Sequence, residues 1–138
     1  MTENQYAIKP IGVIRSLLTN LDEAPRQGDE GGHKAWLELH EPVAPGLIGL
    51  EVDDEIMVVT WLHLAQRDVL QVHPRGERER SLTGVFATRS PHRPNPIGMH
   101  RVSILEINDH SLKVAPMEAV DGTPIVDIKP VLKDIDGR

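Results

Sequence analysis

Short β-type segments separated by turn residues run along the whole chain, and no stretch shows the periodicity of a helix. Because an unpaired strand edge exposes backbone groups, six or more such segments without intervening helices favour a closed barrel or a sandwich. The most apolar run, Glu55–Leu62, is predicted to be the central strand, and His63 follows its C-terminal end. The expected strands are Tyr6–Arg15, Ala35–Leu39, Glu55–Leu62, Val69–Val72, Gly84–Thr88, Met99–Ile107, Leu112–Ala115 and Ile125–Ile128.

The length of 138 residues suits one domain with a sizeable core, and only four residues are aromatic, so that core is predicted to be aliphatic. We expect a single domain over residues 1–138 with no additional C-terminal domain. The absence of cysteine excludes a disulfide framework and a thiolate site. The N-terminus lacks the apolar stretch of a signal peptide, and no apolar run is long enough to span a membrane. We therefore expect a soluble cytoplasmic protein without membrane contact.

The formal net charge of −6 argues against a protein that coats nucleic acid non-specifically, because such binding depends on many contacts between cations and phosphates. The charge is unevenly distributed, however. Six arginines lie between Arg75 and Arg101, whereas four acidic residues cluster between Glu51 and Glu55. A local basic face is compatible with this pattern, and a solvated charged loop at Glu77–Arg80 fits it equally well.

Several common chemistries lack their sequence patterns. Seven histidines are present, but they form neither an HExxH nor a His-x-His motif, so no metal site is predicted. Neither the phosphate-loop pattern nor the Gly-x-Gly-x-x-Gly fingerprint occurs, which excludes a Rossmann-type nucleotide site on pattern. Ser90 has no GxSxG context and is not predicted to be a hydrolytic nucleophile.

The segment GVFATRSPHRPNPIG, residues 84–98, begins like a strand and then places three prolines within residues 91–96. Proline fixes φ, removes a backbone donor and disfavours helix in the residue before it, so these residues predict a rigid loop. Arg89 ends the predicted strand, whereas Arg93 lies between two prolines and is expected to project from the turn. Rigid loops held by strands are suitable places for binding sites.

A second loop, residues 119–130, again places a glycine turn beside proline, with ionisable residues at fixed offsets. Asp121-Gly122 alone is a common turn. Asp127 and Lys129 are two residues apart on a strand and share a face, which a surface ion pair explains as well as a binding role does.

The segments IGVIRS (11–16), PRQ (25–27), GVFATRSPHRPNPIG (84–98) and VDGTPIVDIKP (120–130) resemble the signature segments of the TsaA/TrmO-like (YaeB-like) family. The resemblance runs from about Tyr6 to Pro130. It implies a mainly β, single-sheet antiparallel β-barrel with long irregular loops and little helix. It also implies an S-adenosylmethionine-dependent tRNA methyltransferase that modifies N6 of threonylcarbamoyladenosine next to the anticodon.

The resemblance further implies a set of site residues. An arginine could hold the carboxylate of S-adenosylmethionine through paired hydrogen bonds, and Glu118 could accept from its ammonium or ribose hydroxyls. The implied cofactor-binding residues are Pro25, Arg26, Gln27, His63, Leu64, Arg89, Met99, Pro116, Met117 and Glu118. The residues expected on the tRNA side are His92, Arg93, Asn95, Asp121 and Lys129.

The chain departs from the family pattern at two places, where Val131 replaces a usual tyrosine and residues 52–55 replace a more aromatic stretch. We expect these departures to affect RNA recognition more than cofactor binding. The alternative reading is therefore a protein that binds S-adenosylmethionine without methylating tRNA, or that acts on another substrate. The resemblance also implies a homodimer with the site near the subunit interface.

Overall fold

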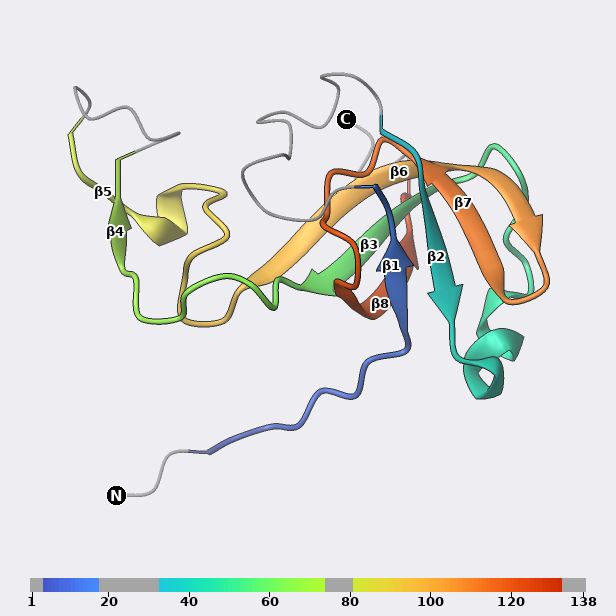
Figure 1. Cartoon of the computed structure of the whole chain (residues 1–138), viewed down its shortest axis with the longest axis horizontal. Helices are drawn as coiled ribbons and strands as arrows, with labels where there is room; N and C mark the ends of the chain where they lie inside the picture. The colour runs from blue at the N-terminus through green and yellow to red at the C-terminus, as the bar shows by residue number, and fades with distance from the viewer. Residues whose placement is uncertain (1–3, 18–32, 74–80, 133–138) are drawn as a thin grey trace.

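A closed antiparallel barrel forms the body of the protein in the computed structural model, which describes residues 4–17, 33–73 and 81–132 (Figure 1). Its strand order is β1-β2-β7-β6-β3-β8. The bounds are β1 Gly12–Arg15, β2 Ala35–Leu39, β3 Glu55–Trp61, β6 Ile97–Asn108, β7 Ser111–Ala115 and β8 Pro124–Pro130. The mainly β fold class and the single-sheet barrel are confirmed.

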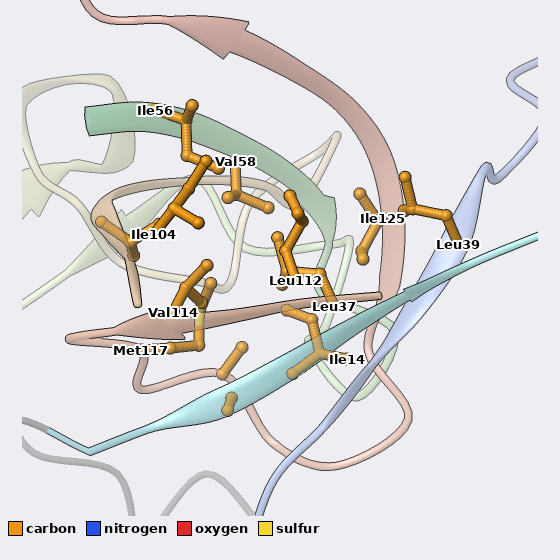
Figure 2. Packing of buried hydrophobic residues seen from close by; sticks show 13 residues of the cluster. Ile14, Leu37, Leu39, Ile56, Val58, Ile104, Leu112, Val114, Met117 and Ile125 are labelled. Carbon is orange, nitrogen blue, oxygen red and sulfur yellow. The ribbon is translucent and has the colours of Figure 1, made fainter. Parts of the chain in front are cut away.

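Strict alternation along the strands builds the barrel interior. In β3, Ile56, Val58 and Thr60 are fully buried, whereas the residues between them are partly exposed. Aliphatic side chains from the other strands meet them in the interior (Figure 2). The described core contains no aromatic side chain, as the composition predicts. Burial of this apolar surface is the main force that closes the sheet.

A projecting segment, which we call the arm, connects β3 to β6, and its described residues are 62–73 and 81–96 (Figure 1). It contains a two-stranded sheet of β4 (Gln71–Val72) and β5 (Thr83–Gly84), followed by the 3-10 helix η4 (Val85–Ala87). The arm therefore holds the proline-rich loop at a distance from the barrel core.

Ala35–Leu39 has the expected limits, four expected strands differ from the observed ones by one or two residues at an end, and three lose at least half of their expected length. The strand predicted at Gly84–Thr88 ends after Gly84, because Val85 is buried and its carbonyl accepts both the backbone N–H and the hydroxyl of Thr88 within one turn. The strand predicted from Tyr6 begins only at Gly12, since Pro10 lacks a backbone donor and Tyr6 is 86% exposed. The Val69–Val72 strand is shortened to β4. After β2, a segment that contains Pro42, Pro45 and Gly46 forms another 3-10 helix, η2 (Glu41–Leu47).

Candidate functional site

One end of the barrel is closed by the loop of residues 116–123 between β7 and β8. The Met117 backbone N–H donates to the His33 carbonyl at 2.8 Å, and the Gly122 N–H donates to the Ile14 carbonyl at 2.7 Å. The side chain of Met117 is 1% exposed and packs in the core (Figure 2). Among the predicted cofactor residues of this loop, Pro116 and Glu118 are half-buried and keep access to solvent.

A buried polar group lies next to Glu118. The His100 ring, on β6, is 7% exposed, and its Nε2 lies 2.8 Å from Oγ1 of Thr60 on β3. Its Nδ1 has no hydrogen-bond partner and lies 3.7 Å from Oε1 of Glu118, which is longer than a hydrogen bond. When the Thr60 hydroxyl donates to Nε2, the ring proton sits on Nδ1 and faces the carboxylate.

Gly98 makes room for this pair. A Cβ at Gly98 would lie 2.6 Å from Thr60 Oγ1 and 3.0 Å from His100 Nε2. The sequence patterns predict no role for His100, which is one of the seven histidines that form no metal-binding motif. The signal was available in the strand alternation, because Gly98, His100 and Val102 all point inward from β6.

The proximity of His100 holds the pKa of Glu118 below its ordinary value, although burial of the carboxyl acts in the opposite direction. A second, weaker attraction comes from His33. Glu118 is therefore an ionised carboxylate on a loop that the barrel fixes in place. Because its pKa is lower in the folded chain, its contribution to stability is present near neutral pH and is lost as the pH falls through the lowered pKa.

Replacing His100 by glutamine is expected to raise the pKa of Glu118, since burial then acts without the attraction of the imidazole. The stability that the protein gains from ionisation of this carboxylate should therefore be smaller near neutral pH than in the parent protein. NMR titration of the Glu118 carboxyl carbon measures the shift directly. The matched control is His63→Gln, which removes an exposed histidine on the arm. An unchanged Glu118 titration in the His100 variant would show that the two side chains do not interact.

Arg93 stabilises the arm through hydrogen bonds to the arm's own backbone. Its guanidinium donates to the carbonyls of Val85 at 2.6 Å, Ser90 at 2.9 Å and Thr88 at 3.2 Å. The expectation that Arg93 projects from the turn is therefore wrong, because these carbonyls turn the side chain into its own loop. Arg89 differs. It is exposed, and its guanidinium makes no hydrogen bond or ion pair with any described residue.

The other polar residues of the proline-rich loop also have partners within the arm. His92 Nδ1 accepts from the Gln66 backbone N–H at 3.0 Å, which leaves the ring proton on Nε2. Arg67 donates to the Pro94 carbonyl at 2.9 Å and to Asn95 Oδ1 at 3.2 Å. The Arg67 guanidinium also lies 5.1 Å from the centroid of the Trp61 ring. Arg67, which is not among the residues predicted from the sequence, thus connects this loop to the end of β3.

The remaining predicted residues lie at several places. His63 and Leu64 are exposed where the arm leaves β3. Met99 is 53% exposed and points to the opposite face of β6 from His100. Asp121 accepts from the Ser16 backbone N–H at 3.1 Å, and exposed Lys129 forms an ion pair with Asp127 at 3.3 Å. The predicted Pro25, Arg26 and Gln27 lie outside the described residues.

Within the part of the chain that the structure describes, no group of three or more His, Asp or Glu side chains could hold a metal ion. The same part contains no helix long and apolar enough to cross a membrane.

Comparison with known proteins identifies the family. Residues 13–137 match the sequence pattern of the tRNA-methyltransferase O N-terminal domain. The chain belongs to this family. A relative from Methanothermobacter thermautotrophicus, named as a probable S-adenosyl-L-methionine-binding protein, is 41% identical over 99% of this chain and 97% of its own. An S-adenosyl-L-methionine-binding protein from Archaeoglobus fulgidus is 43% identical over 94% of this chain and 91% of its own.

Solved structures of tRNA-methyltransferase O share the fold. The crystal structure of the Pseudomonas aeruginosa protein has a TM-score of 0.79 and 30% sequence identity, and the match covers 98% of this chain. The matched region makes up 60% of the solved chain, so this chain spans about three fifths of that protein. The proposed resemblance to the TsaA/TrmO-like family is confirmed.

Proposed function

We propose that the protein is an S-adenosylmethionine-dependent methyltransferase that acts on tRNA, at N6 of threonylcarbamoyladenosine next to the anticodon. The observation that carries this proposal is the match of residues 13–137 to the tRNA-methyltransferase O N-terminal domain. The names of the archaeal relatives support the cofactor.

The described residues fit this cofactor. S-adenosylmethionine carries a carboxylate, an ammonium group, ribose hydroxyls and an electrophilic methyl group on sulfur. Glu118 is an ionised, partly exposed carboxylate that can accept hydrogen bonds from the ammonium group or the ribose. Arg89 is an exposed cation with no partner among the described residues, and its guanidinium can pair with the cofactor carboxylate.

The main task of the protein in this reaction is alignment. In the overall change the substrate nitrogen gains the methyl group, the sulfonium carbon–sulfur bond breaks, and the nitrogen loses a proton. Because the donor is already strongly electrophilic, holding donor and acceptor in line and excluding water supply most of the rate increase. The internal hydrogen bonds of the arm and the backbone hydrogen bonds of the Glu118 loop suit this role, because they limit the motion of both segments.

Replacing Arg89 by alanine is expected to weaken S-adenosylmethionine binding by roughly 10- to 100-fold, the effect of losing a charge-assisted hydrogen bond. Isothermal titration calorimetry measures the change. Arg101→Ala is the matched control, because Arg101 is an exposed arginine that pairs with Glu55 on the outer face of the barrel. Equal affinities in the two variants would remove Arg89 from the cofactor site.

We also propose that the protein acts as a homodimer. Large apolar side chains are exposed on and beside the arm, with Phe86 at 81%, Leu70 at 63% and Met99 at 53%. Exposed side chains of this size are costly to leave in water, and in a two-fold contact each copy would bury the same ones. Light scattering should give twice the monomer mass, and Phe86→Asp should reduce it. A parent protein that is monomeric and fully active at tens of micromolar would contradict the dimer.

The second candidate function is cofactor binding without methyl transfer, which the relatives' names favour because they state binding alone. Incubation with methyl-labelled S-adenosylmethionine and bulk tRNA separates the two candidates. The proposed enzyme transfers label to RNA in proportion to its concentration. Saturable cofactor binding without labelled RNA would support the binding protein instead.

A further inference from the structure

A row of side chains crosses the outer face of the barrel on three adjacent strands. The strand register places Arg15 of β1 directly opposite Trp36 of β2, and Trp36 directly opposite Lys113 of β7. Their chain neighbours Ile14, Ala35, Leu37 and Leu112 are buried, so all three members of the row point outward. The indole ring therefore has a cationic residue on each side, and the Lys113 ammonium lies 6.0 Å from its centroid.

This row lines an open hollow of about 420 Å³. Lys34, which precedes β2, adds a third cation to its wall, and Asp121 supplies the carboxylate among the lining residues. The Arg15 guanidinium is shared between Glu38 at 3.4 Å and Asp121 at 4.0 Å, so Lys34 and Lys113 are the cations with no carboxylate partner among the described residues. In a chain with a net charge of −6, this is a local concentration of positive charge around an aromatic surface.

The hollow adjoins the loop that carries Glu118. Asp121 lies three residues after Glu118 and accepts from the Ser16 backbone N–H, while the Ser16 hydroxyl donates to the Ala119 carbonyl at 3.2 Å. These bonds join the end of β1 to the loop between β7 and β8. A ligand in the hollow would therefore contact the loop that also carries Glu118.

We propose that this hollow binds one nucleotide of a single-stranded RNA segment, with the base on Trp36 and the phosphates on Lys34 and Lys113. Aromatic rings are the usual platforms for unpaired bases, and nearby cations hold the backbone of the strand. Asp121 can accept from a ribose 2′-hydroxyl or an exocyclic amine, because its second carboxylate oxygen makes only the distant contact with Arg15. The inference rests on the proposed function in that the bound strand carries the methyl acceptor.

The fluorescence of Trp36 provides the test, in a Trp61→Phe background where Trp36 is the only tryptophan. The probe is a synthetic anticodon stem-loop RNA. Stacking should quench the fluorescence saturably. Trp36→Ala should weaken RNA binding by about tenfold or more, whereas Trp36→Phe, which keeps an aromatic face, should lose clearly less.

Lys34→Gln and Lys113→Gln should each reduce the slope of log affinity against log salt by about one phosphate contact. Lys9→Gln, at an exposed lysine before β1, should leave that slope unchanged. Unquenched Trp36 fluorescence at saturating RNA, or equal affinities for the parent and Trp36→Ala, would overturn the inference.

Failure of the inference and failure of the proposed function give different results. S-adenosylmethionine affinity, measured by calorimetry, should be unchanged in Trp36→Ala, so loss of RNA binding in that variant is not a loss of the cofactor site. Normal methyl transfer in Trp36→Ala would contradict RNA binding at Trp36 but would agree with the proposed methyltransferase activity. Quenching by RNA without methyl transfer would support the platform and contradict the enzyme.

Discussion

Replacing Gly98 by alanine is expected to lower the free energy of unfolding by about 2–3 kcal/mol. The added Cβ would lie 2.6 Å from Thr60 Oγ1, 3.0 Å from His100 Nε2 and 3.1 Å from the nearer methyl group of Leu62. Thr60 is fully buried and hydrogen-bonded to His100, so neither side chain can move without breaking that bond. The cost therefore combines overpacking with the loss of a buried hydrogen bond.

Urea unfolding measures this loss. The matched control is Gly46→Ala in η2, where an added Cβ meets no atom within 4 Å. A second check is the double variant with Thr60→Ala, which removes the atom that clashes and should recover part of the stability. If Gly98→Ala and Gly46→Ala unfold at the same urea concentration, Gly98 does not pack against the Thr60–His100 pair.

Replacing Arg93 by alanine is expected to loosen the arm by about 1.5–3 kcal/mol while the barrel stays folded. The guanidinium donates to three carbonyls between Val85 and Ser90, and alanine supplies none of these hydrogen bonds. Hydrogen exchange should therefore accelerate at the Thr88 amide, which donates to the Val85 carbonyl. The Ile104 amide, which donates to the Asp54 carbonyl within the barrel body, should keep its protection from exchange.

Two variants control this experiment. Arg93→Lys keeps the charge but loses the planar, forked donor, so it should recover only part of the protection. Arg89→Ala removes an exposed arginine from the same loop and should leave exchange unchanged. Arg89 lies between the residues whose carbonyls accept from Arg93, so Arg93→Ala should also weaken cofactor binding. This result would differ from the sequence-based expectation, which places Arg93 on the tRNA side alone. If the Thr88 amide in Arg93→Ala exchanges as slowly as in the parent protein, Arg93 does not stabilise the arm.

The strands of the barrel could be predicted because alternation of apolar and polar residues is a local property. Ala35–Leu39 was predicted with the observed limits, and Glu55–Leu62 differs from β3 by one residue. The predicted strand from Tyr6 begins too early, because Tyr6 and Ile8 are exposed and only the residues from Gly12 pair with β2 and β8. Val85–Ala87 has the composition of a strand, but buried Val85 and the hydroxyl of Thr88 favour a tight turn.

The candidate site could be predicted only in part. The resemblance pointed to Glu118 and Arg89, and the structure leaves both with access to solvent. It could not show that Arg93 bonds to its own loop, because the carbonyls that turn it inward are positioned by the fold. His100 and Glu118 are 18 residues apart in the sequence and meet only when β6 and the loop after β7 close one end of the barrel. The row of Arg15, Trp36 and Lys113 likewise depends on strand register.

Nucleoside mass spectrometry of tRNA treated with the protein and S-adenosylmethionine tests the proposed activity most directly. The substrate is tRNA from a strain that lacks the family enzyme, and the control is the same tRNA without the threonylcarbamoyl group. We expect one added methyl group on threonylcarbamoyladenosine in the first sample and none in the control. Threonylcarbamoyladenosine that stays unmethylated after incubation with a protein that binds the cofactor would contradict the proposal.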